Sequence, residues 1–169
     1  MQLYDKILDA AFWKKVCSDP AYADIISLIR ADYEEQARES LIALPFSLRN
    51  RFYTDGDRSQ FEKYYFGRRV LLSSAAILAL LYPENERYLR DVEDTLWAIC
   101  DEYSWAVPAH CTNDYADGIT RVDLFVAETG AAVAEITALL KERLHETVFV
   151  RARAELKRRV FENYRNSHF

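Results

Sequence analysis

LRDVEDTLWAICDEYSWAVPAH, residues 89–110, is the stretch that decides the fold class. Its apolar residues recur at intervals of three and four, which places them on one face of a helix. That face consists of Leu89, Val92, Leu96, Ile99 and Tyr103. A proline-bearing loop then follows, so the stretch predicts a helix that packs on a core through one side and ends before Pro108.

The same periodicity extends in both directions along the chain. The further helices that it predicts cover about residues 3–16, 20–41, 59–81, 125–140 and 148–160. Asp19 before Pro20 is typical of an N-cap, and Asp57 or Ser59 is expected to cap the third helix. That helix is apolar on nearly all sides toward its end, which predicts burial between neighbours.

Two connections interrupt the helices. Residues 43–58 carry Pro45 and Gly56 and are expected to form the longest non-helical segment, and a second loop is expected over 104–119. No alternating strand pattern of useful length occurs, and short connections favour antiparallel helical hairpins. We therefore expect a single all-α domain over residues 1–169, built as an irregular bundle or as part of an α/α toroid.

Composition narrows the classes of partner. The net charge is −5, from 22 basic and 27 acidic residues, so no overall attraction to nucleic acid or to an anionic membrane is expected. Residues 151–159 are rich in Arg and Lys, but the cations spread around the helix and alternate with Glu155 and apolar positions. A solvated face with local ion pairs is the expected reading.

Targeting and metal signals are weak. The N-terminus mixes charges among its apolar residues, unlike a signal peptide, and the longest apolar run is shorter than the roughly twenty residues that span a bilayer. The three cysteines show no CxxC spacing, which favours reduced thiols in a cytoplasmic protein. Zinc binding by Cys100, His110 and Cys111 lacks a further ligand, so neither metal nor cofactor is expected.

Three segments carry a resemblance to a known family. They are LWAICDEYSWAVPAH (96–110), VDLFVAETGAAVAEITALL (122–140) and RARAELKRRVFENY (151–164). In this order they resemble the N-terminal helical region of heparinase II/III-like polysaccharide lyases, over about residues 64–169. The resemblance implies an α/α toroid followed by a β-sandwich, and cleavage of uronic-acid polysaccharides or oligosaccharides by β-elimination.

The resemblance also implies a sugar-facing cleft with three substrate-binding candidates. Trp105 is expected to stack on a sugar ring, His110 to hydrogen-bond a hydroxyl or carboxylate, and Tyr103 to lie beside them, whereas Trp97 is expected in the core. Packing for Trp105 and tying down the loop for His110 are the alternatives. Asp101 and Glu102 point about 100° apart on a helix, which does not suit a glycosidase carboxylate pair.

The chain departs from the family pattern at its end. It stops at NYRNSHF, before the expected catalytic Asn- and His-bearing segments, so the catalytic residues stay unknown and this piece alone is expected to be inactive. An incomplete toroid would leave an apolar patch uncovered, which predicts self-association. The alternative is a non-catalytic helical module that binds carbohydrate or a protein partner.

Overall fold

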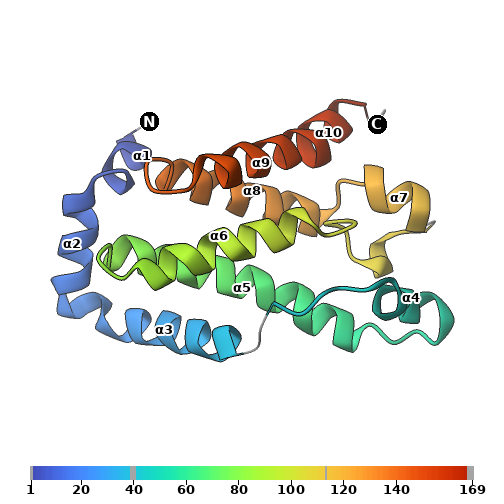
Figure 1. Ribbon diagram of the computed structural model, residues 1–169, viewed down its shortest axis with the longest axis horizontal. Coiled ribbons are helices and arrows are strands. Elements are labelled where there is room, and N and C mark those ends of the chain that lie inside the picture. Colours follow the sequence, from blue (N-terminus) through green and yellow to red (C-terminus); the bar gives the residue numbers. More distant parts are fainter. Residues whose placement is uncertain (1, 39–40, 113, 167–169) are drawn as a thin grey trace.

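A computed structural model describes residues 2–38, 41–112 and 114–166. Helices dominate these residues and no strand occurs among them, so the all-α prediction is confirmed. The long helices run side by side along the long axis of the molecule (Figure 1). They are α3 (Ala23–Arg38), α5 (Ser59–Leu81), α6 (Glu86–Cys100), α8 (Leu124–Leu139) and α9 (Glu146–Leu156).

Antiparallel pairing relates long helices that follow one another along the chain, as the short connections predict. α5 and α6 form one hairpin and α8 and α9 form another, while α3 packs on α5 and α6 packs on α9 (Figure 1). α5 lies centrally and is buried on nearly all sides, because its apolar residues do not keep to one face. By length and composition α5 could cross a membrane, but 56% of its most apolar window is buried in the fold, and core helices meet the same criterion.

Short helices close the two ends of the long ones. α1 (Gln2–Ile7), α2 (Ala10–Ser18) and η1 (Pro20–Tyr22) lie at the end where α5 turns into α6 (Figure 1). At the opposite end lie α4 (Phe46–Thr54), η2 (Pro108–His110) and α7 (Asp114–Thr120). The chain finishes with the π-helical turn η3 (Lys157–Glu162) and α10 (Asn163–Asn166).

Side-chain caps explain several helix starts. The Asp19 carboxylate accepts a hydrogen bond from the N–H of Ala21 at 3.0 Å, which confirms the predicted cap before Pro20. The Asp57 carboxylate accepts from the N–H of Ser59 at 2.9 Å at the start of α5. The N-cap position of α5 is Arg58, one residue beyond Asp57.

Several sequence predictions of secondary structure were wrong. The loop expected over 104–119 contains η2 and most of α7. The single helix expected over residues 3–16 is two helices, because the Asp9 side chain caps a new start by accepting from the N–H of Ala11. The segment 43–58 is not a long loop, since α4 occupies its middle. Pro45 at the N-cap of α4 and Gly56 after its end, at φ 77°, bound a short helix and do not prevent one.

Candidate functional site

The residues that the sequence singles out lie in the connection from α6 to α8, residues 101–123. We call this connection the site loop. It contains η2 and α7 and lies at the end of the molecule that also carries α4 (Figure 1). Three buried side chains fix the site loop to the core, namely Glu102, Trp105 and Arg159 of η3. The rings of Tyr103 and His110 lie at its surface.

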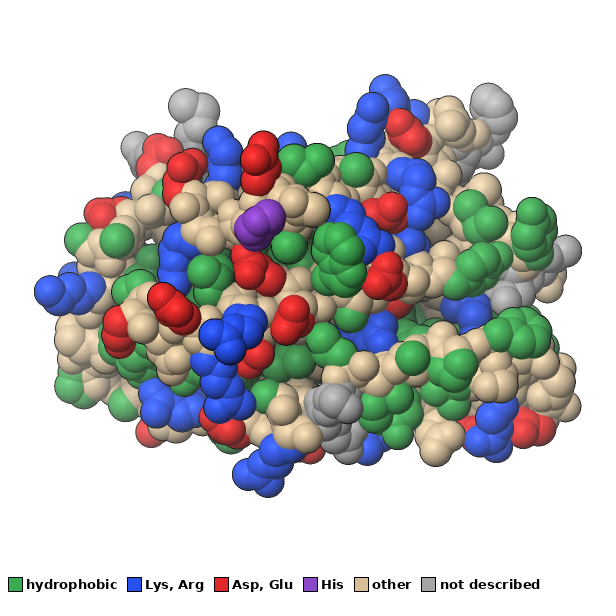
Figure 2. Space-filling model, in the orientation of Figure 1, with side chains coloured by type: hydrophobic (Ala, Val, Ile, Leu, Met, Phe, Trp, Pro, Cys, Tyr) green, Lys and Arg blue, Asp and Glu red, His purple; other side chains and the backbone are tan. Residues whose placement is uncertain are grey.

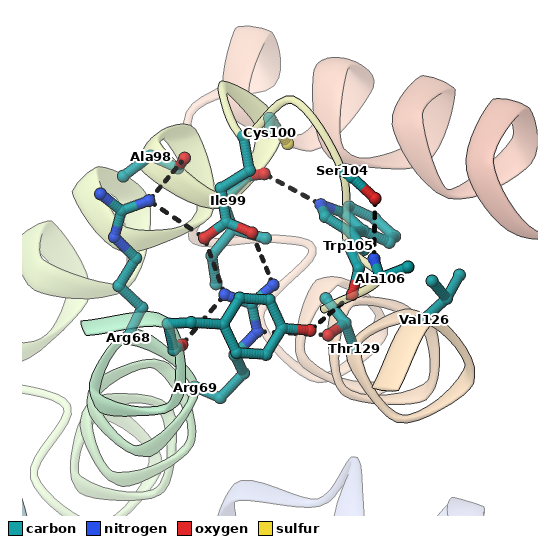
Figure 3. A network of polar contacts seen from close by, with 12 residues as sticks. Arg68, Arg69, Ala98, Ile99, Cys100, Ser104, Trp105, Ala106, Val126 and Thr129 are labelled. Atoms are coloured by element: carbon teal, nitrogen blue, oxygen red, sulfur yellow. Dashed lines mark hydrogen bonds and ion pairs between the residues drawn. The ribbon is translucent and has the colours of Figure 1, made fainter. Parts of the chain in front are cut away.

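Glu102 is the first anchor, and its buried carboxylate meets the guanidinium groups of Arg68 and Arg69, which Figure 3 labels. Arg69 binds its carboxylate through two nitrogens, with Nη1–Oε1 at 2.7 Å and Nη2–Oε2 at 2.6 Å. Arg68 adds a third contact from Nη1 to Oε1 at 3.0 Å. Burial acts to lower the pKa of Arg69, but the Glu102 carboxylate outweighs it and raises that pKa. The Arg69 guanidinium therefore stays charged, and its pair with Glu102 fastens the start of the site loop to α5.

Trp105 is the second anchor, and its expected exposure was wrong. Only 1% of the side chain is exposed. Its indole Nε1 donates to the carbonyl of Ile99 at 2.9 Å, and the Tyr65 hydroxyl donates to the carbonyl of Trp105 at 2.6 Å (Figure 3). The loop folds back under the end of α6, which brings the ring into the core. The indole is therefore a packing element in this structure, and its expected stacking on a sugar has no exposed face to use.

Arg159 of η3 is the third anchor. Its guanidinium donates to the carbonyls of Cys100, Glu102 and Tyr103 at 3.2, 2.6 and 3.3 Å. These carbonyls follow the last turn of α6 and lack helical partners, so a cation there also suits the helix dipole. The guanidinium lies 5.1 Å from the centre of the Trp105 ring. Arg159 is buried and does not lie on a solvated face, which corrects the reading of residues 151–159 at this position.

Trp97, in contrast to Trp105, lies at the surface of the molecule. Its side chain is 42% exposed, although a core position was expected. One residue along a helix turns by about 100°, so the neighbour of buried Leu96 faces away from the core. The Arg151 guanidinium lies 4.0 Å from the ring centre and is paired with Asp101 at 2.5 Å. Acidic and basic side chains are interspersed over the face drawn in Figure 2, as local ion pairing predicts.

Tyr103 lies on the surface of the site loop. α6 ends at Cys100, so Tyr103 does not continue the buried face that its spacing predicted, and 46% of it is exposed. The hydroxyl donates to the carbonyl of Tyr115 at 3.1 Å, and the Arg49 guanidinium lies 5.5 Å from the ring centre. Arg49 is itself buried and donates to the carbonyl of Ala106 at 3.1 Å, which joins α4 to the loop.

His110 is the second exposed ring, with 40% of its side chain accessible. Its Nδ1 lies 2.6 Å from Oδ2 of Asp123, and the ring stacks on Phe125 at a centroid distance of 5.2 Å and an interplanar angle of 10°. The other Asp123 oxygen, Oδ1, accepts from the N–H of Val126 at 2.8 Å and caps α8. The helix cap therefore fixes the orientation of the Asp123 carboxylate independently of its contact with the imidazole.

This arrangement determines what His110 can do. A carboxylate at Nδ1 fixes the orientation and tautomer of an imidazole and directs Nε2 outward. The structure gives Nε2 no partner among the residues it describes. The imidazole can therefore donate or accept one hydrogen bond, or move one proton, at the surface of the site loop. Both expected roles of His110, tying down the loop and facing outward, are compatible with this geometry.

Sequence reasoning missed the groups that support this site. The capping pattern of Asp123 before an apolar helix was a usable signal, since Asp is a preferred N-cap. The partners of Glu102 lie 33 and 34 residues away on α5, and no local pattern indicates them. Within the described residues, no group of three or more His, Cys, Asp and Glu side chains is placed to hold a metal ion.

No protein-family model matches the chain, and a search of curated proteins finds no match either.

Proposed function

We propose that this chain is the N-terminal helical part of a heparinase II/III-like polysaccharide lyase and that it binds uronic-acid glycans through the site loop. The observation that carries the proposal is the exposed His110 imidazole, held at 2.6 Å by a buried carboxylate that also caps α8. Such a fixed imidazole suits a hydroxyl or carboxylate of a bound sugar. Trp105 is not part of this proposed contact surface.

The helical arrangement supports a toroid as the wider architecture. Two antiparallel hairpins, α5/α6 and α8/α9, lie side by side, and the site loop connects them at one end. In an α/α toroid, hairpins of this kind are set around a central axis, and a cleft at one end is lined by their connections. The toroid and its completion by further hairpins are part of the proposal.

The β-elimination reaction needs more groups than this chain supplies. β-Elimination must neutralise the uronate carboxylate, remove the C5 proton and protonate the departing O4. His110 offers one nitrogen for such work, oriented by Asp123. Several groups must converge on the reacting sugar, so we expect substrate binding from this chain and no turnover by it alone.

Calorimetric titration with a uronate oligosaccharide tests the proposal, with a neutral oligosaccharide of equal length as the ligand control. Replacing His110 with Ala should weaken binding at least tenfold and leave the melting temperature nearly unchanged, because the ring is largely exposed. His145→Ala is the matched protein control, since His145 is exposed and caps α9. Equal affinity of wild type and His110→Ala, or no binding by wild type, would contradict the proposal.

An observation at the same end favours the alternative, a non-catalytic binding module. Tyr115, Phe161 and Tyr164, from α7, η3 and α10, are all more than half exposed, and aromatic side chains of this kind mark contact surfaces. The two functions differ in product. A lyase that contains this chain releases an unsaturated uronate, which absorbs ultraviolet light, whereas a module binds glycan or protein and releases none.

A further inference from the structure

The helix α2 has an apolar side that the rest of the fold leaves partly uncovered. Phe12, Trp13, Val16 and Cys17 share that side, because residues three and four apart lie on one face of a helix. None of the residues of α2, all of which the structure describes, is buried. The indole Nε1 of Trp13 donates to the carbonyl of Ile7 at 2.7 Å, so α1 already satisfies the polar edge of this ring.

A hollow of about 1050 Å³ lies beside this helix, and we call it the N-terminal hollow. α2 lines it from its first residue to its last, through Ala10, Trp13, Lys14, Cys17 and Ser18. At a rise of 1.5 Å per residue these positions extend over about 12 Å, so the hollow is elongated along α2. Its volume is at the upper end of the range of about 300–1,000 Å³ for small-molecule sites.

The remaining apolar wall comes from three other elements. These residues are Ile7 and Leu8 at the end of α1, Leu80, Leu81 and Pro83 at the end of α5, and Ala138 and Leu139 at the end of α8. Apolar walls within one chain usually approach until their side chains interdigitate, since a gap between them forfeits dispersion contacts. Apolar walls that stand apart around an elongated space suit an apolar ligand that fills it.

Charged side chains complete the lining, with one more cation than carboxylate. The cations are Lys14, Lys141 and Arg143, and the carboxylates are Glu84 and Glu142. Lys141 and Glu142 form a pair at 3.7 Å. All of these residues except Arg143 are exposed, so the charges lie at the rim and leave the apolar walls to the interior.

Two of the cations remain without a carboxylate partner among the described residues. The Arg143 guanidinium donates to the carbonyls of Ala79 and Pro83 at 2.6 and 3.1 Å, and these neutral acceptors do not compensate its charge. Lys14, on α2, has no ion-pair partner in the part of the chain that the structure describes. Glu84 is the remaining unpaired carboxylate of the lining, so the balance of charge favours one bound anionic group.

We infer that the N-terminal hollow binds a long-chain fatty acid, with the alkyl chain between the apolar walls and the carboxylate at Lys14. The elongated apolar space matches an alkyl chain. A flexible lysine stem packs along apolar surface and keeps its ammonium at the open edge, where a carboxylate can meet it. The hollow lies at the end of the molecule opposite the site loop (Figure 1), so this inference does not depend on His110 or on the proposed lyase function.

Calorimetric titration of the chain with dodecanoate, kept below its micelle concentration, tests the inference. We expect saturable one-to-one binding. Dodecanol has the same chain without the charge and should bind several-fold more weakly, whereas butanoate has the charge without the chain and should not bind. Absence of saturable dodecanoate binding would overturn the site. Equal affinities for dodecanoate and dodecanol would overturn the assignment of a carboxylate.

One pair of variants tests the apolar space. Ala138→Phe places a large side chain in the N-terminal hollow and should raise the Kd for dodecanoate about tenfold or more. Ala127→Phe is the matched control, because Ala127 is exposed on the same helix and does not line the hollow. Wild-type affinity in Ala138→Phe would refute the site. So would light scattering that shows a dimer of the wild type dissociated by Ala138→Phe, without fatty-acid binding, since a second copy would then be the occupant.

A second pair tests the head group. Lys14→Gln should raise the Kd for dodecanoate about fivefold, as expected for an exposed charge pair, and leave the Kd for dodecanol unchanged. Lys15→Gln is the matched control, since Lys15 is exposed on α2 and does not line the hollow. Equal losses in Lys14→Gln and Lys15→Gln, or an equal loss for dodecanol, would show that Lys14 does not bind the carboxylate.

Discussion

Replacing Trp105 with Ala should be among the most destabilising single changes in this protein. The side chain is 1% exposed, and truncating a buried aromatic residue costs about 3–5 kcal/mol. The change also removes the indole N–H that donates to the Ile99 carbonyl, at a cost of about 1 kcal/mol. Since a domain of this size has about 5–15 kcal/mol of unfolding free energy, this loss is a large share of the total stability.

Trp97→Ala is the matched comparison in the same helix-loop segment. Its ring is 42% exposed and contributes mainly the contact with Arg151, worth about 0.5–1 kcal/mol at an exposed site. Urea unfolding followed by far-ultraviolet circular dichroism measures both variants without relying on tryptophan emission. A loss of 4 kcal/mol lowers the midpoint by about 2 M at an m value of about 2 kcal/mol/M.

Trp105→Phe separates packing from hydrogen bonding. It keeps an aromatic ring and loses the indole N–H, so it should fall between wild type and Trp105→Ala. If Trp97→Ala destabilises the chain as much as Trp105→Ala, the burial of the two rings is not as described, and Trp105 returns as a candidate sugar platform.

Three further results are expected. Glu102→Gln leaves two buried guanidinium groups without their carboxylate and should cost about 3–5 kcal/mol in urea unfolding. Gly130→Ala places a Cβ 2.8 Å from Cγ2 of Val160 and should cost about 1–3 kcal/mol, part of which Val160→Ala recovers in the double variant. Burial raises the pKa of the Cys100 thiol to about 11, so it stays protonated at neutral pH, and peptide mass spectrometry after brief alkylation should find Cys17 modified first.

The helices were predictable because their signals are local. The spacing of Val92, Leu96 and Ile99 predicts the buried face of α6, and all three are fully buried. The same spacing also indicates that Trp97 is exposed, because the position one residue after Leu96 points away from the buried side of α6. The core prediction for Trp97 was wrong because it relied on the neighbouring apolar pattern and on how often Trp packs in a core, and not on the direction of this position. The extent of α6 was overestimated because Tyr103 fits the spacing beyond the last helical residue.

The environment of the site loop was not predictable in this way. Trp105 is buried by contacts with Tyr65 on α5 and Arg159 on η3, which lie 40 and 54 residues away along the chain. The ion cluster of Glu102 likewise depends on the docking of α5 against the end of α6. Long-range contacts of this type produce no periodic pattern in the sequence. A loop position therefore did not imply exposure here, although most loops lie on the surface.

The anchors of the site loop make stability and binding separable in this protein. Glu102, Trp105 and Arg159 fix the backbone from the buried side, so the outward position of His110 does not depend on the imidazole itself. Asp123 serves both purposes, because one oxygen caps α8 and the other holds the ring.

Asp123→Asn keeps a capping side chain and removes the charge beside His110, whereas Asp123→Ala removes both, at a cost of about 1 kcal/mol for the lost cap. If His110 acts on a sugar through its orientation, both variants should weaken uronate binding, and only Asp123→Ala should lower the urea midpoint. Wild-type affinity in both variants would show that the carboxylate caps a helix and does nothing more.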